Sequence, residues 1–104
     1  MNAAQDKVSI FNTAHALHRE AHVRLLDLLS ELGETSKEYL TYTDYGRVSF
    51  LKSPEWEAEL GDLYYSLLSL ANETEIDLDG ALKETLDKYT HRIEEKKTPG
   101  SPAV

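Results

Sequence analysis

The 104-residue sequence contains no cysteine, which excludes disulfides, thiolate metal sites and a cysteine nucleophile. Glycine and proline are scarce, with five and three residues, so few positions interrupt regular secondary structure. No apolar run is long enough for a membrane span or a signal peptide, and we therefore expect a cytoplasmic protein that does not contact membranes. A chain of this length is expected to form one domain with a modest core.

Basic residues are also in short supply. Eleven Lys and Arg stand against 19 Asp and Glu, which gives a formal net charge of -8. Non-specific binding to nucleic acid depends on Lys and Arg, so this charge argues against a nucleic-acid partner. An acidic protein can still bind a phosphorylated small molecule if its carboxylates hold a cation that bridges to the phosphate oxygens.

Helical periodicity runs through most of the chain, and no segment has the alternation of a strand. Ser53 and Pro54 mark one helix start, because Ser is a favoured N-cap and Pro is favoured at the first helical position. Asp77 is the expected N-cap of the last helix. These signals predict four helices: one from about residue 3 to a break near residues 18–21, then about 22–40, 54–72 and 78–96.

The predicted fold class is therefore all-α, with a four-helix core. The apolar stripe of the third helix, at four- and three-residue spacing, is expected to face that core. The domain is expected to span residues 1–97. A Pro- and Gly-rich tail follows over residues 98–104.

Two pairs of carboxylates stand out, E-L-G-E at residues 31–34 and E-L-G-D at residues 59–62. Residues three apart lie on one face of a helix, so each pair projects from one stripe, and packing of the two helices would bring four carboxylates together. Four anions repel and are costly to desolvate, and a hard cation such as Mg²⁺, which prefers oxygen ligands, relieves that cost. The pattern predicts a metal site formed by Glu31, Glu34, Glu59 and Asp62.

A solvated acidic surface is the alternative, because short motifs of this kind are common on exposed helices. Two details favour a site. No Lys or Arg lies four residues after any of the four carboxylates to pair with it. Gly33 and Gly61 interrupt their helices at a cost of about 0.5–1 kcal/mol each relative to Ala, which suggests that a ligand or another backbone approaches closely.

In this order, the two motifs resemble the signature of the MazG-type nucleoside triphosphate pyrophosphohydrolases of the all-α NTP pyrophosphatase superfamily. The family pattern is E-E-x-x-E on one helix and E-x-x-D on the next. The resemblance runs from about Gln5 to Arg92 and includes the segment LYYSLLSLANETEIDLDGAL. Ser30 replaces the first Glu of the pattern, but Glu31 and Glu34, which correspond to the metal-facing pair, are kept.

The resemblance implies hydrolysis of a (d)NTP between the α and β phosphates to (d)NMP and pyrophosphate, as house-cleaning of the nucleotide pool. Mg²⁺ is the implied cofactor, with Mn²⁺ as an alternative. Glu31 or Glu34 is expected to act as the catalytic base. The expected substrate contacts are Lys88, Arg92, Lys52 and Asn12: the first three for phosphates, the last for the base.

Three alternatives stay open. Lys88 and Arg92 could instead pair with Glu84 or Asp87 at the surface. D-L-Y-Y-S-L-L from residue 62 is also similar to phosphoribosyl-ATP pyrophosphohydrolase. A noncatalytic helical interaction module with solvated acidic stripes is the rival from another class.

A small four-helix unit that opens one side for metal and nucleotide leaves apolar surface uncovered, so we expect a homodimer or a dimer-based tetramer. The expected uncovered residues are Ile10, Phe11, Leu17 and part of residues 25–29.

Overall fold

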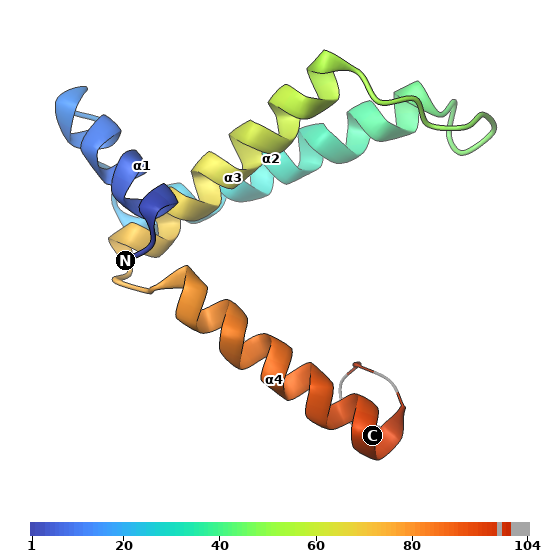
Figure 1. Cartoon of the computed structure of the whole chain (residues 1–104). Helices are drawn as coiled ribbons and strands as arrows, with labels where there is room; N and C mark the ends of the chain where they lie inside the picture. Colours follow the sequence, from blue (N-terminus) through green and yellow to red (C-terminus); the bar gives the residue numbers. More distant parts are fainter. Residues whose placement is uncertain (98, 101–104) are drawn as a thin grey trace.

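The computed structural model describes residues 1–97 and 99–100, and Figure 1 shows its four helices. They are α1 (Ala3–Ala14), α2 (Ala21–Tyr42), α3 (Pro54–Glu73) and α4 (Leu78–Lys96). No strand occurs among the described residues, so the predicted all-α class is confirmed. None of the helices within these residues is long and apolar enough to cross a membrane. The expected tail lies outside the described residues except for Pro99 and Gly100.

Local signals place the helix ends close to where the sequence predicts them. Ser53 caps α3 by accepting a hydrogen bond from the Trp56 N–H at 3.2 Å, and Asp77 caps α4. The expected break between the first two helices is present but starts earlier, because α1 already ends at Ala14. Arg24 in the first turn of α2 is buried and donates to the Leu17 carbonyl, which anchors this connection to α2.

The arrangement of the helices is open. In Figure 1, α2 and α3 run side by side in opposite directions as a long hairpin, and α1 packs on α3. α4 leaves the end of α3 and runs away from the hairpin. Among the described residues, only Leu68 and Ala71 are buried apolar side chains. The expectation that the apolar stripe of α3 faces a core therefore holds only in part, since Leu60 and Leu67 are exposed.

A buried polar network joins α1 to the end of α3 and the start of α4. Gln5 is fully buried, and its amide nitrogen donates to Asn72 Oδ1 at 3.2 Å and to the Ile76 carbonyl at 2.7 Å. Its amide oxygen accepts from the Leu78 N–H at 2.9 Å. These bonds hold the short connection between α3 and α4, so they set the direction in which α4 leaves the hairpin.

Candidate metal centre

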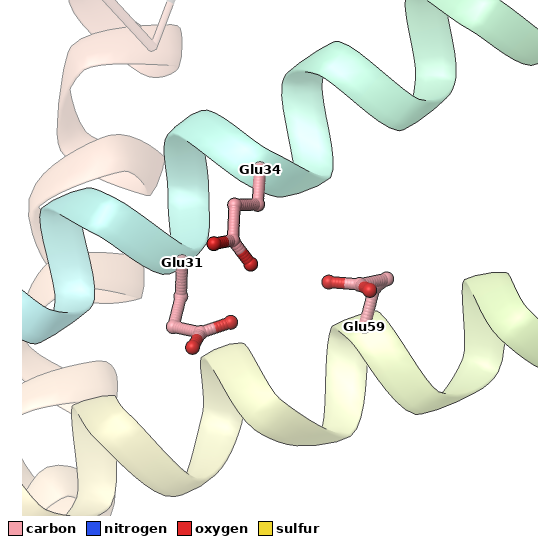
Figure 2. A group of neighbouring side chains, drawn as sticks. All are labelled: Glu31, Glu34 and Glu59. Carbon is pink, nitrogen blue, oxygen red and sulfur yellow. The ribbon is translucent and has the colours of Figure 1, made fainter.

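Three carboxylates meet between α2 and α3. Figure 2 shows Glu31 and Glu34 of α2 and Glu59 of α3 pointing into the space between the two ribbons. One oxygen from each lies within 4.8 Å of the others. Antiparallel packing places the E-L-G-E turn of α2 opposite the E-L-G-D turn of α3, and the i, i+3 spacing puts Glu31 and Glu34 on the same side of their helix. The structure thus brings together three of the four predicted ligands.

Asp62, the fourth predicted ligand, is not part of this close group. Its side chain is exposed on α3, one turn beyond Glu59. Its negative charge nevertheless helps to raise the pKa of both Glu31 and Glu59, so it lies within electrostatic reach of the site. A cation placed among the three close carboxylates would attract it as well.

Burial and crowding of like charge raise the pKa of two carboxyl groups at the site. The pKa of Glu31 lies above its usual value, first because of burial and then because of the neighbouring charges, Glu34 foremost. The pKa of Glu59 is also raised, first by burial and then by four carboxylates, of which Glu38 has the largest effect. Both shifts mean that the ionised form is disfavoured in the metal-free protein.

Two carboxylate oxygens at the site have neither a hydrogen-bond donor nor a basic side chain as partner among the described residues. Glu59 Oε2 and Glu38 Oε2 are buried and have no hydrogen-bond partner. Within the described part of the chain, none of the predicted metal ligands forms an ion pair with Lys, Arg or His. An unsatisfied buried group costs about 1–3 kcal/mol, and more when it is charged. A hard divalent cation fits this all-oxygen donor set and would remove that cost.

Glu38 is a member of the site that the motif analysis left out. It lies one turn beyond Glu34 on the same side of α2, and its charge acts on Glu59 across the hairpin. The signal was present in the sequence, since Glu38 is four residues after Glu34 and seven after Glu31. Only the pairing of the two helices shows that its charge acts on a carboxylate of α3.

The two helical glycines are not explained by contacts within the chain. A side chain at Gly33 or Gly61 would meet nothing within 4 Å among the described residues, so no backbone in the chain approaches either position. Gly33 follows Glu31 by two residues, which places it about 200° around the helix, on the far side from the carboxylates. The expected close approach of another backbone is therefore absent among the described residues, and the approach of a ligand stays a prediction.

Asn12 lies in the interior of the α1–α3 contact. Its side-chain oxygen accepts from the Tyr65 hydroxyl, and its nitrogen donates to Ser69 Oγ at 3.2 Å. Both ends of the amide are therefore engaged, and the residue is buried. This placement favours a structural role over the predicted contact with a nucleobase.

Two of the three predicted basic contacts lie on α4, away from the carboxylates within one chain. Lys88 and Arg92 are on α4, which diverges from the hairpin in Figure 1. Lys88 lies over the Tyr89 ring at 5.5 Å, and Arg92 donates to the Pro99 carbonyl at 3.3 Å. The alternative pairing of Asp87 with Lys88 or Arg92 is not formed among the described residues. Asp87 pairs instead with Lys83 at 3.2 Å, and Lys52 is exposed just before α3.

Without a divalent ion, the protein should lose stability as pH rises above the usual glutamate pKa of 4.5. The folded state holds protons on Glu31 and Glu59 that the unfolded chain has already released in this window, so the free energy of unfolding falls with rising pH. Saturating Mg²⁺ should raise Tm and flatten this dependence, because the ion favours the ionised carboxylates.

The check is Tm against pH in EDTA and in Mg²⁺, with the Glu31→Gln/Glu59→Gln variant as control. The wild-type trend should be steeper than that of the variant, which lacks both titrating groups. Identical curves for the two proteins in EDTA would contradict the prediction.

Comparison with protein families gives one clear match. The model of the MazG nucleotide pyrophosphohydrolase domain matches residues 20–96, which include α2, α3 and α4 and all four predicted metal ligands. The match confirms the resemblance seen in the paired motifs. No curated protein and no solved structure matches the chain significantly.

Proposed function

Since the chain belongs to the MazG nucleotide pyrophosphohydrolase family, we propose that it hydrolyses a nucleoside triphosphate between the α and β phosphates. The products would be a nucleoside monophosphate and pyrophosphate. The observation that supports this most strongly is the convergence of Glu31, Glu34 and Glu59 without a basic partner. The proposed role is removal of noncanonical or surplus (d)NTPs in the cytoplasm.

The proposed cofactor is Mg²⁺, held by Glu31, Glu34 and Glu59, with Asp62 as the fourth ligand. Mn²⁺ has the same preference for carboxylate oxygen and is the alternative. A bound ion of this kind polarises phosphate oxygens and lowers the pKa of a coordinated water. The carboxylates themselves neutralise the ion and fix its position between the two helices.

The proposed catalytic base is Glu31 or Glu34. A base must accept a proton from the attacking water, so it has to be a carboxylate that the ion does not fully engage. Glu31 is half-buried between the two helices. Glu34 is more exposed and is better placed to meet a substrate that arrives from solvent.

The proposed phosphate contacts are Lys88 and Arg92, with Lys52 as a helper. In the single chain α4 carries the first two away from the carboxylates, so their contribution requires another copy of the chain or a movement of α4. We also propose a homodimer or a dimer-based tetramer as the working unit. The exposed apolar residues Ile10, Phe11, Leu25 and Leu29 support self-association.

A panel of canonical and noncanonical (d)NTPs together with phosphoribosyl-ATP tests the proposal. We expect equal amounts of nucleoside monophosphate and pyrophosphate in Mg²⁺, and none in EDTA. Release of orthophosphate from a triphosphate would contradict cleavage between the α and β phosphates. Hydrolysis of phosphoribosyl-ATP alone would identify the related activity. Absence of all hydrolysis, with no Mg²⁺ site by calorimetry, would support the noncatalytic helical module.

A further inference from the structure

A pocket borders the metal centre at the end of α2 that leads into the loop of the hairpin. Its volume is about 350 Å³, within the range of about 300–1,000 Å³ that is usual for small-molecule sites. Four side chains of α2 line it: Lys37, Glu38, Thr41 and Tyr42. Glu38 also acts by its charge on Glu59 of the metal centre, so the pocket and the carboxylates share a border.

Glu38 brings to this pocket an acceptor that has no donor. Its Oε2 is buried without a hydrogen-bond partner, and the side chain forms no ion pair among the described residues. Glu38 is not one of the three carboxylates that lie within 4.8 Å of one another, so an ion held by those three does not supply a donor to it. The last torsion of a glutamate is soft, and repulsion from Glu59 favours turning both oxygens of Glu38 toward the pocket.

The other walls of the pocket supply a cation and an aromatic ring. Lys37 is exposed and forms no ion pair within the described part of the chain, so its ammonium group can donate to a ligand. Tyr42, the last residue of α2, is 38% exposed. Aromatic side chains stack on nucleobases of every kind, so Tyr42 would add affinity without specificity. The Thr41 hydroxyl already donates to the Lys37 carbonyl at 2.9 Å.

We propose that this pocket holds the base of the substrate and selects the edge of guanine. Guanine presents one acceptor, O6, beside two donors, N1–H and the 2-amino group. Lys37 donates to O6, while the two oxygens of Glu38 accept from N1–H and from the 2-amino group. Tyr42 stacks on the ring. The inference rests on the proposed function and deepens it, because it names the class of base as a purine with a 6-oxo and a 2-amino group.

The other bases match these groups less well. Adenine and cytosine place an unprotonated ring nitrogen next to their amino group, and uracil and thymine have a carbonyl oxygen on each side of N3–H. A carboxylate has acceptors only, so an acceptor placed opposite it is repelled and stays unpaired. Hypoxanthine keeps O6 and N1–H but lacks the 2-amino group, so it loses one bond to Glu38. The pocket therefore ranks dGTP first and dITP second.

The position of the pocket suits a nucleotide whose α phosphate meets the ion. Along the axis of α2, Glu38 lies about 6 Å beyond Glu34, and Tyr42 lies about 12 Å beyond it. The sugar spans the space between an α phosphate at the carboxylates and a base in the pocket. All the proposed base contacts come from α2, so they do not depend on the direction that α4 takes in Figure 1.

A second divalent cation is the other occupant that Glu38 could attract. Glu38 is the one carboxylate that lines the pocket, and the ammonium group of Lys37 beside it repels a cation. A base that carries one acceptor and two donors satisfies both side chains at once. The mixed charge of the lining therefore favours a base over a second ion.

The ratio of kcat/KM for dGTP to kcat/KM for dITP isolates the 2-amino group. For the wild type in Mg²⁺ this ratio should be at least about ten, because dITP leaves one carboxylate oxygen unpaired. Glu38→Gln should bring the ratio close to one, since an amide presents a donor where a carboxylate oxygen stood. Glu57→Gln removes an exposed carboxylate of α3 outside the pocket and should keep the wild-type ratio. Lys37→Met should lower kcat/KM for dGTP and dITP by the same factor, because both bases carry O6.

Two results of these assays would overturn the assignment of the base. One is a ratio near one for the wild type, or a wild-type ratio in Glu38→Gln. The other is a loss of activity in Glu38→Gln by the same factor for every nucleotide, which would show that Glu38 binds an ion. Hydrolysis of all (d)NTPs at similar rates would leave the proposed pyrophosphohydrolase intact and overturn the base assignment alone.

Binding of the products tests the pocket without hydrolysis. In calorimetric titrations with Mg²⁺, dGMP should bind at least about tenfold more tightly than dIMP. Glu38→Gln should lose this difference while its helical circular dichroism is retained. Equal affinities, or no binding of either nucleotide, would overturn the pocket. Tighter binding of dGMP by a protein that hydrolyses no nucleotide would support the pocket and overturn the proposed reaction alone.

Discussion

Glu34→Gln and Glu59→Gln should each reduce metal-dependent hydrolysis by at least about 100-fold, with helical circular dichroism unchanged. Each substitution keeps the shape of the side chain but removes a charge from the close group between α2 and α3. Loss of one anion also relieves the repulsion in the metal-free protein. We therefore expect Tm in EDTA to stay the same or rise, while the increase in Tm caused by Mg²⁺ disappears. Pyrophosphate release and thermal melts with and without Mg²⁺ measure both effects.

Glu57→Gln is the matched control, because Glu57 lies on the same helix, is exposed and is outside the close group. It should keep wild-type activity and the wild-type response to Mg²⁺. Near-normal hydrolysis in both Glu34→Gln and Glu59→Gln would overturn the metal centre. Asp62→Asn decides the fourth ligand: a loss as large as that of Glu59→Gln means that Asp62 reaches the ion.

Gln5→Leu should destabilise the protein by roughly 2–4 kcal/mol, the largest stability effect that we expect from a single substitution. Leucine keeps most of the volume but leaves Asn72, the Ile76 carbonyl and the Leu78 N–H without their partner. For a domain of this size, each kcal/mol lowers Tm by about 4–8 °C. Denaturation should be measured at one fixed protein concentration, since self-association would add to the apparent stability.

Lys7→Ala provides the comparison on the same helix. Lys7 is exposed, so its loss should change stability by less than about 0.5 kcal/mol. If the Tm of Gln5→Leu lies within about 2–3 °C of the wild-type Tm, the loss of stability is well under about 1 kcal/mol. The network then does not hold the junction of α1, α3 and α4. In that case the direction of α4 would have to depend on other contacts.

The sequence by itself determined the helices and the pairing of the carboxylates. The signals for helix ends act within a few residues, as at Ser53 and Asp77, so each could be recognised locally. The convergence of Glu31 and Glu34 with Glu59 followed from spacing, because i, i+3 positions share a side and the loop between Tyr42 and Pro54 lets α3 run back along α2. The family match over residues 20–96 includes both motifs.

Only the tertiary structure decided which sides of the helices are covered. Asn12 was expected at the substrate but is bonded to Tyr65 and Ser69, more than fifty residues further along the chain. The departure of α4 from the hairpin depends on Gln5 and Leu78, which are 73 residues apart. Helical periodicity reports that a face is apolar, but it does not report what covers that face. Contacts between distant segments decide what covers an apolar stripe, and in the single chain the stripes with Leu60 and Leu67 on α3 and with Leu82 and Leu86 on α4 stay exposed.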